Sequence, residues 1–261
     1  MISASPEVIT IVMFGLLIVL IGSGFPLGLA LGGVALISGL LFWNASIFSL
    51  FYDRLFGVTT NYTFLAVPLF IFMGIMVEKS GMSTELFSSL YLWLGGIRGG
   101  LAVATIWFGT ILAATVGVIA ASVTMLGLIA LPSMLERGYA KGIATGACTA
   151  GGSLGILIPP SIMLIIYGPM ANISVGKLFM AAFPAGLTLS ILYTAYILIR
   201  CALRPNEAPV LPPEERNVPM SRKLYLLFTA LLPPVILVLA VLGSIFFGIA
   251  APTEAAAVGA L

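Results

Sequence analysis

A long apolar segment, residues 142–176, carries no charged side chain and is interrupted in the middle by residues that do not suit a helix. The interruption holds Gly151-Gly152, Gly155 and the pair Pro159-Pro160. Lipid cannot satisfy the backbone groups that a broken helix frees, so the break must be buried in protein or face a watery cavity. Freed carbonyls can then bind a cation, and helix N-termini can face an anion. This pattern is typical of the site of a secondary transporter.

Composition defines the class of the chain. Hydrophobic residues make up 61% and charged residues 8%, with a mean hydropathy of +1.20, whereas soluble domains carry about 25% charged residues. We predict an all-α polytopic membrane protein. Each charge-free run can hold at least one crossing of about 20 residues; the runs are 8–52, 55–77, 99–135, 142–176, 178–199 and 224–253. Residues 1–7 have no basic residue and no small-residue cleavage site follows them, so we expect a first membrane helix, not a signal peptide.

Several function classes are disfavoured by what the sequence lacks. The chain has no histidine, which removes histidine-ligated zinc and the Ser-His and Cys-His catalytic arrangements. Cys148 and Cys201 lie in apolar surroundings, where lone thiols usually serve packing. The net charge of +2 is spread over short loops, so no nucleic acid is expected as a partner. We expect no enzyme activity and no cofactor.

The remaining pattern predicts individual helices. We expect helices over about 8–23, 26–48, 62–79, 178–199 and 224–247, with a loop around 44–61. Residues 80–98 have apolar residues at helical spacing and a polar start, which indicates an interfacial helix anchored by Trp93. Glu254 is the acid with a plausible intramembrane position, either as a functional carboxylate or as a helix cap.

Residues 99–135 predict a helical hairpin. A single helix of this length would measure about 55 Å, nearly twice the hydrocarbon thickness. Two helices meeting at Thr115–Ser122 fit better, either as two full crossings or as a re-entrant hairpin. Both arrangements leave the two ends on one side of the membrane. We favour the re-entrant hairpin, because a full crossing would expose the polar tip to water for no evident reason. The broken helix follows, over about 142–168.

With this topology, basic residues gather on one face, as the positive-inside rule requires of the cytoplasmic side. Opposite them lie Arg54 and Lys177. The N-terminus is then predicted to be periplasmic, and residues 206–221 form a proline-rich cytoplasmic linker. The basic residues of the predicted cytoplasmic face are Lys79, Arg98, Arg137, Lys141, Arg200, Arg204, Arg216, Arg222 and Lys223.

After the linker the pattern of the first helices begins again. Gly22-Ser-Gly-Phe-Pro26 is echoed by Gly248-Ile-Ala-Ala-Pro252. An odd number of crossings precedes the linker, so the second copy enters from the opposite side, as an inverted repeat must. Residues 1–205 are therefore predicted to be a first transmembrane repeat, and residues 222–261 the start of a second, incomplete one. We expect the chain to be part of a longer protein.

The order of several motifs along nearly the whole chain resembles the large membrane subunit of tripartite ATP-independent periplasmic (TRAP) transporters. The motifs are Val67-Pro-Leu-Phe-Ile-Phe-Met-Gly74, Gly127 to Tyr139, Ala144-Thr-Gly146, Gly151-Gly-Ser-Leu-Gly155, Ile158-Pro-Pro-Ser161, Ser174-Val-Gly-Lys-Leu-Phe179 and Pro252-Thr-Glu-Ala-Ala-Ala257. The resemblance implies an elevator-type permease of the bacterial inner membrane. It also implies sodium-coupled import of an organic anion, usually a carboxylate. The implied partners are a small membrane subunit and a periplasmic binding protein.

By position, the resemblance makes Ala113–Ser122 the hairpin tip and Gly151–Ser161 the unwound segment of the broken helix. Many family members have a serine-rich tip, whereas this chain offers only Thr115 and Ser122 there. Backbone carbonyls near Gly117 and Gly152–Gly155 could bind sodium, which prefers hard oxygen ligands. The serines could instead bond a local helix carbonyl. The candidate substrate and ion site comprises Thr115, Gly117, Ser122, Gly152, Ser153, Gly155, Pro159, Pro160 and Ser161.

Two other functions compete with this hypothesis. A binding-protein-independent sodium/dicarboxylate symporter could share the same architecture. An intramembrane enzyme is the remote alternative, since the chain offers neither a nucleophile with a base nor a metal cluster.

Overall fold

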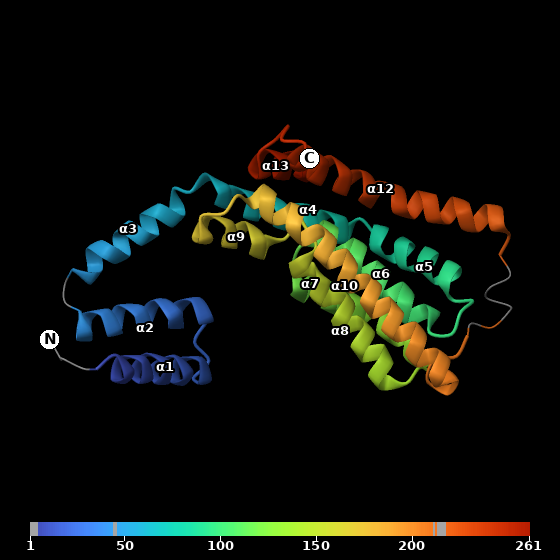
Figure 1. The fold of residues 1–261 in the computed structure, drawn as a ribbon, viewed down its shortest axis with the longest axis horizontal. Coiled ribbons are helices and arrows are strands. Elements are labelled where there is room, and N and C mark those ends of the chain that lie inside the picture. The colour runs from blue at the N-terminus through green and yellow to red at the C-terminus, as the bar shows by residue number, and fades with distance from the viewer. Residues whose placement is uncertain (1–4, 44–45, 211, 213–217) are drawn as a thin grey trace. The chain divides into compact units, whose positions relative to one another are not determined.

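The structure is a computed structural model that describes residues 5–43, 46–210, 212 and 218–261 (Figure 1). Every regular element in these ranges is a helix, and none of them is a strand, in agreement with the predicted all-α class. The chain divides into two compact units, Met1–Asn61 and Tyr62–Leu261, and each is described by itself.

The first unit contains α1 (Pro6–Gly22), α2 (Leu27–Phe42) and α3 (Ile47–Thr59). α1 packs against α2, and the turn between them contains Gly24 at a φ of +87°. The prediction of a loop over 44–61 was wrong for residues 47–59, which form α3. Asp53 and Arg54 lie within this helix, and Tyr52 stacks on Phe56 one turn later, with ring centroids 6.0 Å apart. Two charges were mistaken for a loop signal, although helices tolerate isolated charges on an exposed face. Residues 44 and 45 lie outside the described ranges.

The second unit holds the remaining elements, of which Figure 1 labels the α-helices. They are η1 (Tyr62–Leu65), α4 (Ala66–Lys79), α5 (Met82–Leu94), α6 (Gly100–Val116), α7 (Ile119–Glu136), α8 (Lys141–Leu157), α9 (Ile162–Ala171), α10 (Val175–Leu203), η2 (Pro205–Glu207), α12 (Met220–Phe246) and α13 (Pro252–Ala260).

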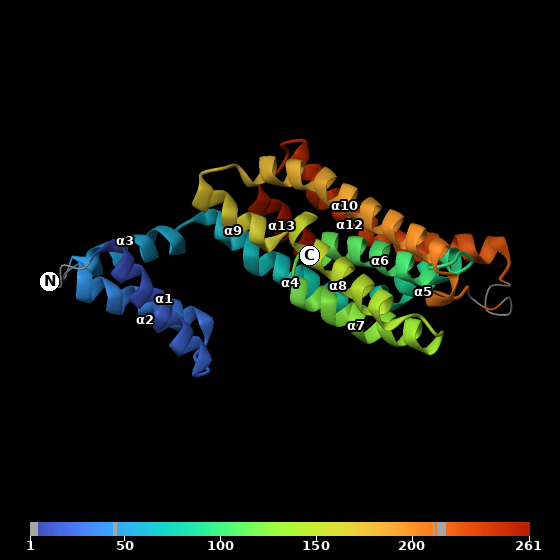
Figure 2. The same ribbon diagram turned by 60° about the horizontal axis from the view of Figure 1, so that its bottom comes forward.

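α6 is the central helix of this unit. It contacts α4, α5, α7, α8, α10 and α12, and all of its residues except Trp107 and Ile111 are buried. A helix that is hydrophobic all round is expected to be buried in this way. α7 returns beside α6, and α8 packs against both, so these three helices form the core of the unit (Figure 2).

A second core lies where α4, α9, α10, α12 and α13 meet. Phe70, Phe179 and Val241 are fully buried there. α13 packs on both α4 and α12. Glu254 accepts a hydrogen bond from the backbone N–H of Ala251 at 2.8 Å, so its carboxylate caps the start of α13. The structure therefore favours the cap over the functional carboxylate.

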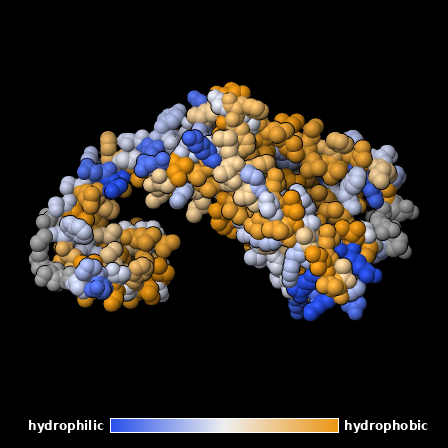
Figure 3. All heavy atoms as spheres, viewed as in Figure 1, coloured by the Kyte–Doolittle hydropathy of each residue, from blue (hydrophilic) through white to orange (hydrophobic). Residues whose placement is uncertain are grey.

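The outer surface of the second unit is largely apolar, as the orange spheres in Figure 3 show. Large apolar side chains point outward, among them Leu128, which is 73% exposed. Five helical segments of the described residues are long and apolar enough to cross a membrane: Tyr62–Lys79, Ile119–Glu136, Lys141–Ala171, Val175–Leu203 and Met220–Phe246. These features agree with the predicted polytopic membrane protein.

α5 is packed against other helices to an extent that the sequence did not predict. Leu86, Phe87 and Leu90 are buried, and the helix packs against α6 and α12. Trp93 donates its indole N–H to the carbonyl of Lys223 at 3.2 Å. α5 is therefore a packed element of the bundle, since its apolar face meets two helices.

Several helix ends meet at one end of the second unit. The N–H of Ala140, just before α8, donates to the carbonyl of Glu207 at 2.8 Å. Gly99, just before α6, lies against Cys201 near the end of α10, so that an added Cβ would be 2.7 Å from its Sγ. The hydrogen bond from Trp93 to Lys223 brings the end of α5 and the start of α12 to the same place. We call this end the basic end, because Arg98, Arg137, Lys141, Arg200, Arg204, Arg222 and Lys223 are found on the segments that meet there. Of the predicted linker 206–221, residues 211 and 213–217, including Arg216, lie outside the described residues.

Candidate functional site

The turn between α6 and α7 lies far from the basic end. Gly117 ends α6 with a φ of +65°, a left-handed conformation that favours glycine, and Val118 is extended. The N–H of Gly117 donates to the carbonyl of Ala113 at 3.2 Å, which closes the last turn of α6. α7 begins at Ile119. Two residues therefore reverse the chain at the position where the sequence predicted the hairpin tip.

α8 and α9 are separated by a short break, Ile158–Ser161, which includes a cis peptide bond between Pro159 and Pro160. Ile158 makes the last helical bond, donating to Leu154 at 2.9 Å. In an α-helix the carbonyls of Gly155 and Ile156 would accept from the residues four positions later, which here are the two prolines. Since proline has no N–H, both carbonyls lose their helical partner.

The hairpin tip and the break are in contact. A Cβ added to Gly117 would overlap the carbonyl oxygen of Pro160 and lie 3.5 Å from the Cα of Ser161. A Cβ added to Gly155 would lie 3.5 Å from both the Oγ of Ser122 and the carbonyl oxygen of Val118. The structure thus brings together candidates that are more than 30 residues apart in the sequence. Gly74 of α4 also approaches the tip, since its added Cβ would be 3.1 Å from the carbonyl oxygen of Val116.

The four candidate hydroxyls differ in their partners. Thr115 donates to the carbonyl of Leu112 at 3.0 Å, Ser122 to Val118 at 3.1 Å, and Ser153 to Ala150 at 2.8 Å. These three show the local bonding to a helix carbonyl that the sequence left open. Ser161 is fully buried in the break, and among the described residues its Oγ has no hydrogen-bond partner. An unpaired buried hydroxyl is costly and calls for a ligand, a water or an ion.

The predicted unwound segment, Gly151–Ser161, was too long. Residues 151–157 continue α8 as a regular helix, so the carbonyls of Gly152 and Ser153 are not at the break. The glycines there serve close packing instead. A Cβ on Gly109 of α6 would lie 2.7 Å from the backbone of Gly151, and one on Gly152 would lie 2.8 Å from the Cα of Val123 in α7. Gly28-xxx-Gly32 and Gly142-xxx-Gly146 have a spacing that permits close helix packing, but in the described part of the chain an added Cβ at any of the four would have nothing within 4 Å.

Sequence reasoning named Pro160 and the carbonyls near Gly117, where Val118 lies, but it missed the carbonyl of Ile156. The signal for Ile156 was present, because counting four residues back from each proline identifies the freed carbonyls. The approach of Pro160 and Val118 depends on how α6, α7 and α8 pack. This approach therefore cannot be predicted without knowing the fold.

Two helices begin at this place. α7 starts after Val118, and α9 starts after Ser161, whose carbonyl accepts from Ile165 at 3.1 Å. The first N–H groups of a helix lack helical partners and carry a partial positive charge. The contact between Gly117 and Pro160–Ser161 brings these two N-termini together, a suitable arrangement for an anion. Among the described residues no group of three or more His, Cys, Asp or Glu side chains could hold a metal ion.

Fold and site together define a multi-pass helical membrane protein with a hairpin turn packed on an interrupted helix. The sequence model of the tripartite ATP-independent periplasmic transporter, DctM component, matches residues 14–261. The chain therefore belongs to this family, as part of a large membrane subunit, and it is a multi-pass protein of the inner membrane.

Individual relatives agree with this assignment. The chain is 32% identical over 253 residues to the C4-dicarboxylate TRAP transporter large permease protein DctM of Vibrio cholerae, covering 96% of this chain and 53% of that protein. It is 35% identical over 208 residues to the protein of the same name from Pseudomonas aeruginosa, covering 80% and 47%. It is 33% identical over 250 residues to the isethionate TRAP transporter permease protein DctMQ of Oleidesulfovibrio alaskensis, covering 95% and 38%. The chain thus spans about half the length of the first two relatives and less of the third.

Proposed function

We propose that this chain belongs to the permease subunit of a secondary transporter that imports an organic anion, delivered by a periplasmic binding protein and driven by a sodium gradient. The observation that carries the proposal is the contact between Gly117 at the hairpin tip and Pro160–Ser161 in the helix break. Family membership supports dependence on a binding protein, and a small membrane subunit as a further partner, over a self-sufficient symporter. We expect the anion to be a carboxylate; the relatives described above are named for C4-dicarboxylate and for isethionate.

Sodium would bind oxygen atoms at the contact. The carbonyls of Gly155 and Ile156 have lost their helical donors, and the Oγ of Ser161 has no partner among the described residues. Hard cations prefer such neutral and anionic oxygens. The anion would face the N-termini of α7 and α9, where unpaired N–H groups lie close to the bound cation. Binding of either ion then favours binding of the other, which is the basis of coupling.

The hairpin formed by α6 and α7 would be re-entrant. α6 has 17 residues, which corresponds to about 26 Å. α9 continues for 10 residues beyond the tip, or about 15 Å more, and both views place α9 beyond the end of α8 (Figures 1 and 2). The tip would therefore end within the thickness of the membrane. An elevator motion would carry the tip and the break together, since Gly109 meets Gly151 and Gly152 meets Val123 through backbone atoms.

Ser161→Ala tests the sodium site in the full-length permease reconstituted with its partner subunits. Removing a buried hydroxyl without a partner should leave thermal stability unchanged or higher, since such a group costs about 1–3 kcal/mol. If the hydroxyl binds sodium, the sodium concentration for half-maximal uptake should rise by about tenfold, the loss expected for one contact to a charged group.

Ser153→Ala is the matched control. Its hydroxyl already bonds the carbonyl of Ala150, so the same loss of an oxygen should not shift the sodium dependence. An unshifted sodium dependence in Ser161→Ala at normal stability would rule out this hydroxyl as a sodium ligand.

A further inference from the structure

A groove of about 470 Å³ opens between α8 and α10, with Ile106 of α6 at its base. Its walls are apolar and include Ile143 and Ala147 of α8 and Leu192 of α10. The volume lies within the range of about 300–1,000 Å³ that is usual for ligand pockets. None of the residues of the hairpin tip or the helix break lines it. It is therefore separate from the proposed transport site.

The groove exists because α8 presents glycines to it. Gly142 and Gly146 line it, and in the described part of the chain a Cβ added to either would have nothing within 4 Å. Glycine in a helix interior costs about 1 kcal/mol relative to alanine. Among the described residues, no helix approaches Gly146 closely enough to account for that cost, in contrast with Gly151 and Gly152.

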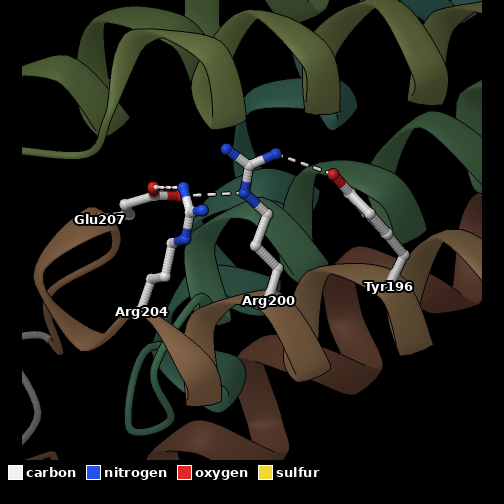
Figure 4. Close-up of polar contacts among 4 residues, drawn as sticks. All are labelled: Tyr196, Arg200, Arg204 and Glu207. Carbon is white, nitrogen blue, oxygen red and sulfur yellow. Dashed lines mark hydrogen bonds and ion pairs between the residues drawn. The ribbon is translucent and has the colours of Figure 1, made fainter.

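One end of the groove is cationic. Tyr196 and Arg200 line it there, and an adjoining hollow adds Arg204. Glu207 holds the two arginines together, accepting from Arg200 Nε at 2.9 Å and from Arg204 at 3.0 Å, while Arg200 also donates to the hydroxyl of Tyr196 at 2.8 Å (Figure 4). These bonds from Arg204 and Arg200 hold the pKa of Glu207 below its ordinary value. The carboxylate is thus ionised at neutral pH, and two arginines against one carboxylate leave a net positive charge.

The groove faces outward along its length. Leu192 is 58% exposed and Tyr196 is 59% exposed. In Figure 3, hydrophilic spheres gather at the ends of α8 and α10 on the lower right, next to apolar surface. Arg200 and Arg204 lie at the basic end, where the chain would meet the headgroup region. In a membrane, the groove would therefore be apolar along the lipid tails and cationic at the headgroup level.

We propose that this groove binds an anionic phospholipid, with one acyl chain between α8 and α10 and the phosphate at Arg200 and Arg204. Guanidinium groups bind phosphate oxygens in a bidentate geometry, and basic pockets between transmembrane helices suit anionic headgroups. A transmembrane helix fits less well, because it would need an acidic side chain placed at the rim to match the net positive charge there, whereas every anionic phospholipid carries its charge next to its acyl chains. A phospholipid supplies the apolar and the anionic parts in the order that the groove presents them.

The first experiment measures lipid retention by the purified full-length permease with native mass spectrometry. We compare phosphatidylglycerol with phosphatidylcholine of the same acyl chains. The wild-type protein should retain phosphatidylglycerol preferentially. Gly146→Leu should abolish this retention, because the added side chain fills the groove without displacing a neighbour. Gly127→Leu is the matched control, since Gly127 is also a helical glycine with open space around its Cβ in the described structure but lies in α7, away from the groove.

Arg204→Gln tests the headgroup contact without altering the groove. Affinity for phosphatidylglycerol should fall about fivefold, as expected for one basic residue near an anionic headgroup, and affinity for phosphatidylcholine should not change. Lys177→Gln, at the opposite end of α10, should have no effect. Equal retention of phosphatidylglycerol in the wild type, Gly146→Leu and Arg204→Gln would overturn the proposal.

A second measurement identifies the occupant directly. A photoreactive amino acid at position 192, on the exposed wall, is activated in membranes that contain the complete transporter. A product with the added mass of a phospholipid supports the proposal. A product joined to a peptide of this protein or of another subunit would show that a helix covers the groove, and would refute it.

Discussion

Thr115 and Ser161 are both fully buried hydroxyl residues close to the hairpin tip, yet their hydroxyls are in different states. Thr115 donates to a carbonyl three residues earlier, as threonine commonly does inside a helix. Ser161 has left the helix and stands at the N-cap position of α9 without making the usual cap bond. Sequence alone identified both residues, but it could not distinguish them, because the difference depends on where α8 ends.

Gly117→Ala tests the contact at the tip. The substitution puts a Cβ on a residue with a φ of +65° and directly against the carbonyl of Pro160. The left-handed conformation alone costs about 1–2 kcal/mol, and the overlap adds to it. We expect a lower unfolding temperature and loss of uptake, measured by thermal unfolding and by transport in vesicles.

Gly127→Ala is the control for that prediction. It lies inside α7 with open space around its Cβ in the part of the chain that is described, so alanine should leave stability unchanged or raise it by up to about 1 kcal/mol. Unchanged stability and uptake in Gly117→Ala would show that the tip does not touch the break.

At the scale of whole elements, α8 explains both the success and the failure of the sequence analysis. Pro159-Pro160 predicted a break, because prolines remove donors whatever the surroundings. The glycines before them were read as part of the break, but residues 151–157 remain helical. The low helix propensity of these glycines is offset by backbone contact with α6 and α7. That contact is a tertiary effect, and local sequence cannot reveal it.

Tyr139, between α7 and α8, is hydrogen-bonded to the start of α6 at the basic end. Its removal tests how much this bond contributes to stability. Its hydroxyl accepts a hydrogen bond from the N–H of Leu101, in the first turn of α6, at 3.3 Å. Tyr139→Phe should leave that buried N–H unpaired and lower the free energy of unfolding by about 1–2 kcal/mol, measured by chemical denaturation. Tyr225→Phe, at an exposed position, is the control and should have little effect.

The pKa of Tyr139 also predicts that the stability of the folded protein falls at alkaline pH. Burial raises the pKa of Tyr139 to about 12, above the unfolded value of about 10. The folded state therefore favours the neutral phenol. This contribution to stability is complete below pH of about 10 and is lost as the pH rises from about 10 towards 12. The loss should be smaller in Tyr139→Phe; an identical alkaline profile would contradict the assignment.

At the scale of the whole molecule, the basic end bears on the predicted membrane topology. By counting loops, the sequence assigned nine basic residues to one side, and the segments that carry seven of them meet at one end of the second unit. Lys79 is not among the seven, because it ends α4 just before the start of α5, and it is the other end of α5 that reaches the basic end. Arg216 lies outside the described residues. The inverted repeat remains a prediction. In both of its motifs a helix ends, a glycine takes a positive φ, and the next helix begins beside a proline, but the positive φ falls on Gly24 in one and on Gly248 in the other.

Cysteine labelling tests this topology. Asn206 in η2, at the start of the predicted linker, and Asn172 between α9 and α10 are suitable sites. In a protein whose two native cysteines are replaced, a cysteine at 206 should react with an impermeant reagent only from the cytoplasm. A cysteine at 172 should react only from the periplasm. Labelling of both from the same side would contradict the assignment.

The contact between Gly109 and Gly151 has a consequence for how such a protein can diversify over evolutionary time. A Cβ on Gly109 would lie 2.7 Å from backbone atoms of Gly151, and one on Gly151 would lie 3.1 Å from the carbonyl oxygen of Thr105 as well as 3.3 Å from the side chain of Leu126. Because backbone atoms stand in the way at both positions, substitution of a neighbouring side chain cannot by itself make room for a larger residue. A lineage that acquires a new solute must therefore leave this pair untouched and explore other positions. Its descendants would keep both glycines together with the packing of α6 on α8, whatever they bind.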